Sequence, residues 1–292
     1  MKVSAGIIGV GAMGGAVARR LLGSGVTTYV RDIRPHAMAE LAALGARACA
    51  SSAQLARACG VIILLVVDAK QIEEVLFGNE GAAEHMQLGS VVLLSSTIAP
   101  EDAARFSEQL SARGMHALDA PVSGGPARAG AGEMSMMIAG DPSAVQHAEP
   151  VLNIISNKIF RVSDKPGDGA RFKLINNMLA ATNLAAGAEA MALGMRMGLD
   201  SKRLLEVIGA SSGASWVMLD RMARALEDDY APRAATKILA KDISLALDLA
   251  SKEHFPAMLA SQAMQAFQAA LAQGLGEEDD ASLLKMYQRL PK

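Results

Sequence analysis

The sequence is poor in cysteine and aromatic residues and has no long apolar run. Its 292 residues include two cysteines, and aromatic side chains make up 3% of the chain. Cys49 and Cys59 have neither CxxC nor metal-ligand spacing, so we expect no disulfide framework, no structural metal and a reduced, cytoplasmic protein. The N-terminal apolar stretch is too short and too rich in glycine for a signal peptide, and no stretch predicts a membrane span.

Basic patches are also missing. Lys and Arg number 28 against 30 Asp and Glu, which gives a formal net charge of −2. Nucleic acid or an anionic membrane would require a basic run or stacking aromatic residues, so we expect neither as a partner and predict a small-molecule substrate. Hydrophobic residues reach 51%, and the excess is mostly alanine and the 17 methionines. This predicts helix packing and a homodimer or homotetramer.

A glycine-rich turn lies near the start of the chain. Residues 2–9 predict a strand, and Gly9, Gly11 and Gly14 follow as G-x-G-x-x-G before an amphipathic helix at 13–22. In this context the backbone can turn tightly, approach a pyrophosphate and point helix N–H groups at it. Alone, the pattern is equally typical of any tight α/β turn, but the flanking strand and helix favour a dinucleotide.

The next expected strand, 26–30, bears on the choice of cofactor. Asp32 lies 18 positions after Gly14, close to where an acidic residue accepts hydrogen bonds from the adenosine ribose, which favours NAD. Arg31 and Arg34 flank it, and either could meet the 2′-phosphate of NADP, so NADP is not excluded. The cofactor-binding residues predicted in this half of the chain are Gly9, Gly11, Ala12, Met13, Gly14, Asp32 and Val67.

Strand and helix patterns alternate as far as residue 162. Further strands are expected at 61–67, 90–94, 115–118, 134–139 and 158–162, with helices at 36–44, 52–58, 71–76, 100–112 and 142–155. The run 61–67 is apolar throughout, which predicts a central parallel strand buried on both faces. The expected fold class is α/β, with a doubly wound Rossmann-type sheet that carries extra strands.

The composition changes at a proline and glycine cluster, 163–169. Only helical stretches follow, at 167–198, 202–208, 216–226, 234–253, 257–271 and 281–290. We predict a dinucleotide-binding domain over 1–164 and an all-α substrate and oligomerisation domain over 165–292. The long helix 167–198 is expected to begin at an Asp168 N-cap and to be buried, with Lys173 and Asn177 four positions apart on one face.

Several polar residues have a structural and a functional interpretation. Ser123, Gly124 and Gly125 follow a strand where a parallel sheet binds ligands, and they could hold a carboxylate, although alone they are more typical of an ordinary turn. Lys173 alone is typical of a surface lysine, whereas burial would lower a lysine's pKa and let it exchange protons near neutrality. Lys241 and the following Asp242 are typical of a solvated helix edge.

The remaining candidates are interpreted as structural. Trp216 is expected in the core. The histidines, including His116 and His254, have no neighbouring Ser, Cys or Asp pattern that would indicate a catalytic triad, and we expect them to be structural or exposed.

Six motifs, in order along nearly the whole chain, resemble the β-hydroxyacid dehydrogenases. They are GVGAMG (9–14), SST (95–97), DAPVSGG (119–125), KLINN (173–177), SGASW (212–216) and KDISLAL (241–247). The resemblance implies hydride transfer between NAD and a small hydroxy acid, with Ser123, Gly124 and Gly125 anchoring the substrate carboxylate.

The resemblance also implies roles for single residues. Lys173 matches the lysine that exchanges a proton with the substrate hydroxyl, and Asn177 matches the asparagine that holds the substrate beside it. Thr97 matches a residue that touches the nicotinamide end of the cofactor, and Lys241 matches a lysine that closes over cofactor and substrate. Asp68 departs from the family pattern, in which many relatives have proline or another small residue.

The sequence indicates the substrate less specifically than it indicates the family. Stretches at 75–86, 122–137, 254–261 and 274–285 are similar to the branch of the family that acts on the four-carbon sugar acid L-threonate. The alternatives are oxidation of 3-hydroxyisobutyrate and reduction of tartronate or succinic semialdehyde with NAD(P)H. An imine reductase or a non-catalytic dinucleotide-binding regulator is disfavoured by Lys173 within KLINN.

Overall fold

The structure, a computed structural model, describes residues 4–290. By its contacts the chain divides into two compact units, of which one ends at Lys173 and the other begins at Leu174. The predicted boundary after residue 164 marks the place where the strands stop. The division by contacts falls later because Ala170, in the next helix, packs in a core of the first unit.

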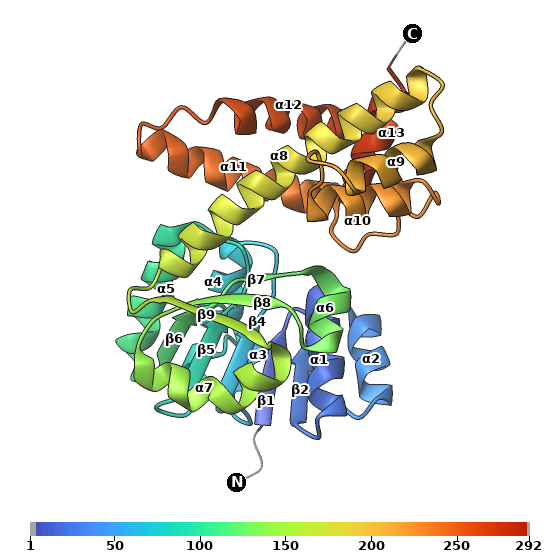
Figure 1. Ribbon diagram of the computed structural model, residues 1–292. Helices are drawn as coiled ribbons and strands as arrows, with labels where there is room; N and C mark the ends of the chain where they lie inside the picture. The colour runs from blue at the N-terminus through green and yellow to red at the C-terminus, as the bar shows by residue number, and fades with distance from the viewer. Residues whose placement is uncertain (1–3, 291–292) are drawn as a thin grey trace. The chain divides into compact units, whose positions relative to one another are not determined.

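A twisted sheet forms the first unit (Figure 1), and within residues 4–290 it has nine strands in the order β3-β2-β1-β4-β5-β6-β8-β7, with β9 paired to β8. Neighbours from β3 to β6 pair in parallel, whereas β8 is antiparallel to β6 and β7 and parallel to β9. The strands are β1 (Ser4–Ile8), β2 (Thr27–Arg31), β3 (Arg47–Ala48), β4 (Val61–Leu64), β5 (Val91–Leu94), β6 (His116–Asp119), β7 (Val122–Ser123), β8 (Ser135–Ala139) and β9 (Lys158–Ser163). The predicted doubly wound sheet with extra strands is confirmed.

Helices cover both faces of this sheet. Successive residues of β1 point to opposite sides, so that Ile7 packs in a core with α1 and α7 while Ile8 packs in a second core with α3, α4 and α5. These helices are α1 (Ala12–Gly23), α2 (Pro35–Ala43), α3 (Ser52–Ala56), α4 (Ala69–Phe77), α5 (Pro100–Ser111), α6 (Gly125–Ala131) and α7 (Pro142–Ile155), with a 3₁₀ turn η1 (Ala83–His85). The sequence predicts neither the two-residue strands β3 and β7 nor α6, a seven-residue helix that contains two glycines and a proline.

The second unit is helical, as predicted. Its described residues form no strand and only an isolated bridge between Ala235 and Asp279. Its helices are α8 (Asp168–Arg196, whose first turns belong to the first unit), α9 (Ser201–Gly209), α10 (Trp216–Ala225), α11 (Thr236–Lys252), α12 (Met258–Ala272), the 3₁₀ turn η2 (Asp280–Ser282) and α13 (Leu283–Gln288). Leu184 and Met191 of α8 belong there to the same core as Ile243 and Phe267. No helix of the described residues is long and apolar enough to cross a membrane.

The long helix α8 is less buried than predicted. Phe172, Ile175 and Leu179 are 55%, 53% and 60% exposed, although their spacing places them along one stripe of the helix. Burial on most faces is therefore a wrong prediction for this helix, because its apolar residues exceed what the rest of the chain covers.

Trp216 is likewise not in the core. It is the first residue of α10 and is 49% exposed, with the Arg221 guanidinium 5.8 Å from its ring centre. The core positions on this helix are taken by Met218 and Met222, two and six residues further on. Because methionine adapts to irregular gaps, it fills this core without the indole ring.

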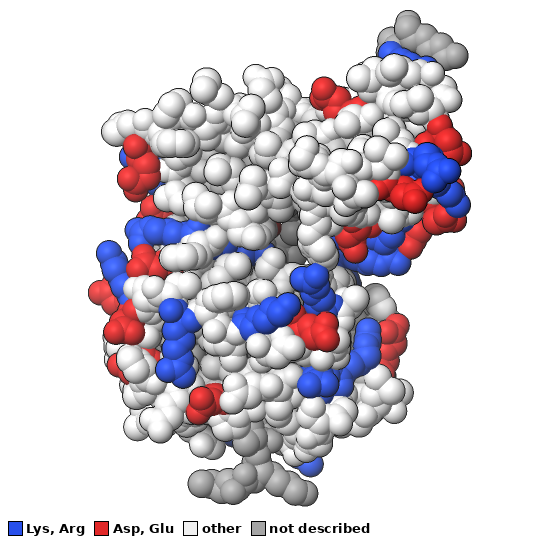
Figure 2. Space-filling view, viewed as in Figure 1, with Lys and Arg blue, Asp and Glu red and all other residues white. Residues whose placement is uncertain are grey.

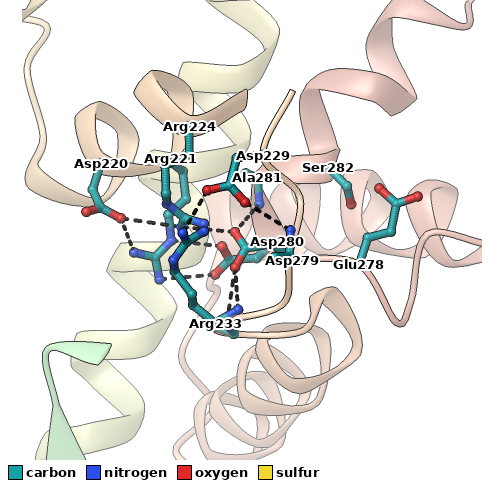
Figure 3. Close-up of polar contacts among 12 residues, drawn as sticks. Asp220, Arg221, Arg224, Asp229, Arg233, Glu278, Asp279, Asp280, Ala281 and Ser282 are labelled. Atoms are coloured by element: carbon teal, nitrogen blue, oxygen red, sulfur yellow. Dashed lines mark hydrogen bonds and ion pairs between the residues drawn. The ribbon is translucent and has the colours of Figure 1, made fainter. Parts of the chain in front are cut away.

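A buried ion-pair cluster links several segments of the helical unit (Figure 3). Arg221 of α10 donates from Nε to Asp280 Oδ1 at 2.8 Å, and Arg224 Nη2 lies 3.0 Å from Asp279 Oδ1. Both aspartates are fully buried, and Asp279 also accepts the backbone N–H of Arg233 at 2.9 Å. The cluster thus joins α10, the segment before α11 and η2. No group of residues that could hold a metal ion is found in the described chain.

Candidate active site

The glycine turn connects β1 to α1 as the sequence predicts. Gly9 has a φ of +89°, and a Cβ atom on Gly14 would lie 1.9 Å from the Gly9 carbonyl oxygen. A Cβ on Gly11 would meet only Arg34 Nη2, at 3.4 Å, so the front of the turn stays open. The first turn of α1 has no side-chain cap. Its N–H groups can therefore receive an anion, and the turn fits the pyrophosphate of a dinucleotide.

Asp32 lies directly behind this turn. Its Oδ2 accepts the Val10 N–H at 2.8 Å, and its Oδ1 accepts the Arg34 backbone N–H at 2.9 Å and Nε at 3.1 Å. Burial raises the pKa of Asp32, but these hydrogen bonds and the Arg34 charge outweigh burial and hold the pKa below its ordinary value. Asp32 is thus a carboxylate beside the turn, and Arg34, one of the two arginines that could meet a 2′-phosphate, lies in contact with it.

Two further groups of predicted cofactor residues follow β4 and β5. The strand β4 ends at Leu64, so Val67 lies beyond it in a loop and is 44% exposed. Ser96 Oγ donates to the Leu64 carbonyl at 3.4 Å, and Thr97 follows it. Because β4 and β5 are parallel neighbours, both segments lie at the carboxyl edge of the sheet, where ligands bind in such folds. Asp68, the departure from the family pattern, caps α4 by accepting the Gln71 N–H at 2.9 Å.

Ser123, Gly124 and Gly125 form the connection between β7 and α6. Ser123 pairs with Ser135 of β8, and the two glycines have φ values of +130° and +75°. Two successive residues with positive φ require glycine, which explains the Gly-Gly pair. The segment is a turn, and it also starts a helix that the sequence does not predict.

Asp119 is a buried carboxyl to which the sequence assigns no role. It ends β6, is fully buried, and its Oδ2 accepts the N–H groups of Gly167 and Ala170, each at 2.9 Å. Burial raises its pKa to about 6 although these backbone N–H groups lower it. Asp119, and not the predicted Asp168, therefore satisfies the N–H groups at the start of α8, whereas Asp168 forms an ion pair with Arg171. A carboxyl inside the motif DAPVSGG was the available signal.

Lys173 and Asn177 lie one turn apart on α8, and both are buried. Lys173 is 7% and Asn177 8% exposed, whereas Phe172 and Ile175 beside them are more than half exposed. The surface interpretation of Lys173 is therefore wrong. A buried amine and a buried amide on one stripe of a helix are groups that can serve proton transfer.

In the helical unit, Asp242 of α11 connects two of the predicted residues. Asn177 Nδ2 donates to Asp242 Oδ2 at 2.7 Å, and Lys241 Nζ lies 2.8 Å from Asp242 Oδ1. Asp242 is 4% exposed, so the solvated-edge interpretation is wrong for this residue. The structure thus brings Asn177 and Lys241 together through a carboxylate that the sequence does not single out.

Two family models match the chain. The NAD binding domain of 6-phosphogluconate dehydrogenase matches residues 4–163. The domain described as NAD-binding of NADP-dependent 3-hydroxyisobutyrate dehydrogenase matches residues 167–287. The gap between the two matches falls in the proline and glycine cluster that precedes α8.

Full-length relatives match as well. L-threonate dehydrogenase of Cupriavidus necator is 43% identical over 287 residues, which are 98% of this chain and 97% of that protein. The enzyme of the same name from Escherichia coli K12 is 38% identical over 97% of this chain and 94% of the relative. The crystal structure of 3-hydroxyisobutyrate dehydrogenase from Salmonella typhimurium has a TM-score of 0.92 and 40% identity, with 97% of this chain and 99% of that chain covered.

Proposed function

Because the chain belongs to the β-hydroxyacid dehydrogenases and is an NAD(P)-dependent enzyme acting on the CH–OH group of hydroxy acids, we propose that it oxidises L-threonate with NAD. The single observation that carries the chemistry is the buried Lys173, one turn before the buried Asn177 on α8. The full-length similarity to L-threonate dehydrogenases supports the substrate.

In the proposed reaction, Lys173 Nζ removes the proton of the substrate hydroxyl, and Asn177 orients that hydroxyl. Ser123 and the backbone of Gly124 and Gly125 hold the substrate carboxylate. Bound NAD would supply the acceptor for the hydride of the carbinol carbon. The gain in rate comes from holding the hydroxyl at the base and from the positioned proton acceptor.

We assign cofactor binding to two groups of residues. The backbone of the glycine turn receives the pyrophosphate, and Asp32 accepts hydrogen bonds from the adenosine ribose. The nicotinamide end of the cofactor is assigned to Val67 and Thr97, which follow β4 and β5, and to Lys241 of α11. The full set is Gly9, Gly11, Ala12, Met13, Gly14, Asp32, Val67, Thr97 and Lys241.

A substrate panel tests this proposal. NADH or NADPH formation is measured with L-threonate, 3-hydroxyisobutyrate and glycerate, and the reverse reaction is measured with tartronate and succinic semialdehydes. We expect the highest kcat/KM for L-threonate with NAD. A higher kcat/KM for 3-hydroxyisobutyrate would replace L-threonate as the substrate, and this alternative is favoured by the name of the similar Salmonella structure.

We also propose that the protein is a homodimer or homotetramer. The exposed stripe Phe172, Ile175 and Leu179 on α8, and Met258 and Leu259 of α12, at 72% and 75% exposure, support this. On the face seen in Figure 2, the charged residues of the helical unit gather toward its edges and leave a broad uncharged area between them. Light scattering at micromolar concentration tests the proposal, and a monomer would contradict it.

We also propose that the protein is located in the cytoplasm. Cys49 and Cys59 are both buried free thiols, which supports the reducing cytoplasm.

A further inference from the structure

Asp242 lies on the face of α11 that packs into the core. The buried residues of this helix include Leu239, Ile243 and Ala246, at the spacing of one helix face, and Asp242 lies among them with 4% exposure. A carboxylate at such a position loses its hydration, which is unfavourable unless its oxygens find charged or hydrogen-bonding partners.

Each oxygen of this carboxylate lies close to a polar side chain. Oδ2 accepts Asn177 Nδ2 at 2.7 Å, and Oδ1 lies 2.8 Å from Lys241 Nζ. The Oδ1 atom is buried and has no hydrogen bond of good geometry within the described residues, so the Lys241 ammonium meets it as an ion pair. Replacing a buried ion pair by apolar residues is often neutral or stabilising, so stability alone gives no reason for a carboxylate here.

The carboxylate also determines how the Asn177 amide is oriented. An ionised carboxylate only accepts hydrogen bonds, so the Nδ2 side of the amide faces Asp242 and the carbonyl Oδ1 faces the other way. Oδ1 accepts Asn176 Nδ2 at 3.0 Å, and a carbonyl oxygen has room for a second donor. Without Asp242, rotation of the amide by half a turn would exchange the acceptor and the donor.

We infer that Asp242 is a positioning residue that fixes both the Asn177 amide and the Lys241 ammonium for the reaction. This rests on the proposed function, because Asn177 and Lys241 receive their roles there. Asp242 itself holds the donor side of the Asn177 amide, so that Oδ1 is the atom presented to a substrate hydroxyl. It also holds the Lys241 ammonium over its own helix.

The variant Asp242→Asn keeps the volume and one acceptor atom but removes the charge and the fixed orientation. We expect its kcat/KM for the best hydroxy acid of the panel to fall by about 10- to 100-fold, because small misplacements of reacting groups cost up to about 10²-fold. We expect the unfolding midpoint to change little. A merely structural residue would instead lower the unfolding midpoint and leave kcat unchanged.

Double-mutant cycles test whether Asp242 acts through its two partners. The cycles combine Asp242→Asn with Asn177→Ala and with Lys241→Ala. If Asp242 acts through them, each double variant loses less activity than the product of the two single losses. If, in both cycles, the loss of activity in the double variant equals the product of the two single losses within about twofold, the inference is overturned. Independent sites are additive to that extent.

Asp280→Asn is the matched control. Asp280 is also a buried carboxylate paired with a cation of the helical unit, but its partner is Arg221. We expect this variant to lower the unfolding midpoint and to keep kcat/KM.

If the wild type prefers another hydroxy acid, the L-threonate proposal fails and the cycles are measured with that acid. If the wild type oxidises L-threonate and Asp242→Asn equals it in kcat/KM, only the present inference fails.

Discussion

The glycine turn of the sheet unit and the Asn177–Asp242–Lys241 group of the helical unit are built in opposite ways. The turn consists of backbone N–H groups and tight glycine contacts within residues 9–14, with Asp32 as its main side chain. The second group consists of side chains on α8 and α11, and its shortest hydrogen bond joins residues 65 positions apart. A site made of backbone has a local sequence pattern, whereas a site made of side chains depends on how helices face each other.

The largest effect is expected where the turn has no space for a side chain. Gly14→Ala places a Cβ atom 1.9 Å from the Gly9 carbonyl oxygen, so the first turn of α1 must move. We expect the NAD dissociation constant to rise by about 10²-fold or more, since a shift near 1 Å is sufficient for such a loss. Isothermal titration calorimetry measures it.

Gly23→Ala is the control for this variant. A Cβ on Gly23, at the end of the same helix, would meet no atom within 4 Å. It should leave NAD binding unchanged and stabilise the protein by about 0.5–1 kcal/mol, since alanine is the better helix former. Equal NAD affinity in the two variants would mean that the turn does not bind the pyrophosphate.

The variant Arg221→Met tests whether the buried ion pair of the helical unit contributes to stability without contributing to activity. The change leaves Asp280 buried without its cation, and we expect the free energy of unfolding to fall by about 3–5 kcal/mol. NAD affinity and kcat of the folded protein should stay the same. Urea unfolding and steady-state kinetics measure the two quantities, and a kcat that falls while stability is retained would contradict this separation.

Asp119→Asn concerns the place where a side chain supports the backbone of α8. Burial raises the pKa of Asp119 from 3.8 to about 6, so between these values the folded state holds a proton that the unfolded state has lost. The stability that protonated Asp119 contributes is therefore complete below about pH 4 and is lost as the pH rises through 6.

The variant lacks this titration. We expect the stability difference, wild type minus Asp119→Asn, to fall by about 3 kcal/mol between pH 4 and pH 7, as a shift of about two units implies. Urea unfolding at a series of pH values measures it. Asp280, whose pKa is also raised to about 6, is present in both proteins and cancels. A difference that grows with pH would show that Asp119 is ionised throughout.

Of the two losses of NAD binding, the smaller is expected for Asp32, the carboxylate beside the glycine turn. Asp32→Asn removes the charge that accepts the Val10 N–H and Arg34. Because a hydrogen bond to a charged group contributes about 1.5–3 kcal/mol, the KM for NAD should rise about 10- to 100-fold. The KM for NADP should rise less, since Arg34 is released toward a 2′-phosphate. An equal rise for both cofactors would remove Asp32 from ribose recognition.

The sequence predicts most of the fold because its signals are local. The alternation of strands and helices, the glycine turn with Asp32 and the change to helices after residue 163 are all patterns of neighbouring residues. The helix α6 is missed because its glycines and proline are weak helix formers. Trp216 is placed wrongly because its burial depends on which side chains of the fold fill the core.

The candidate site is predictable to a smaller extent. The resemblance selects Lys173, Asn177 and Lys241, but no local pattern indicates that Asp242 joins two of them or that Asp119 holds the start of α8. The hydrogen bonds from Gly167 to Asp119 and from Asn177 to Asp242 connect residues 48 and 65 positions apart. Only the folded chain brings them together.

The most direct test of the proposed chemistry is the rate of hydride transfer in Lys173→Ala. The rate of NADH formation is measured in single turnovers at saturating NAD and hydroxy acid. General acid–base catalysis contributes about 10²- to 10⁴-fold, and we predict a loss in that range with an unchanged NAD dissociation constant. A rate within about threefold of the wild type, far less than such catalysis supplies, would show that Lys173 is not the proton acceptor.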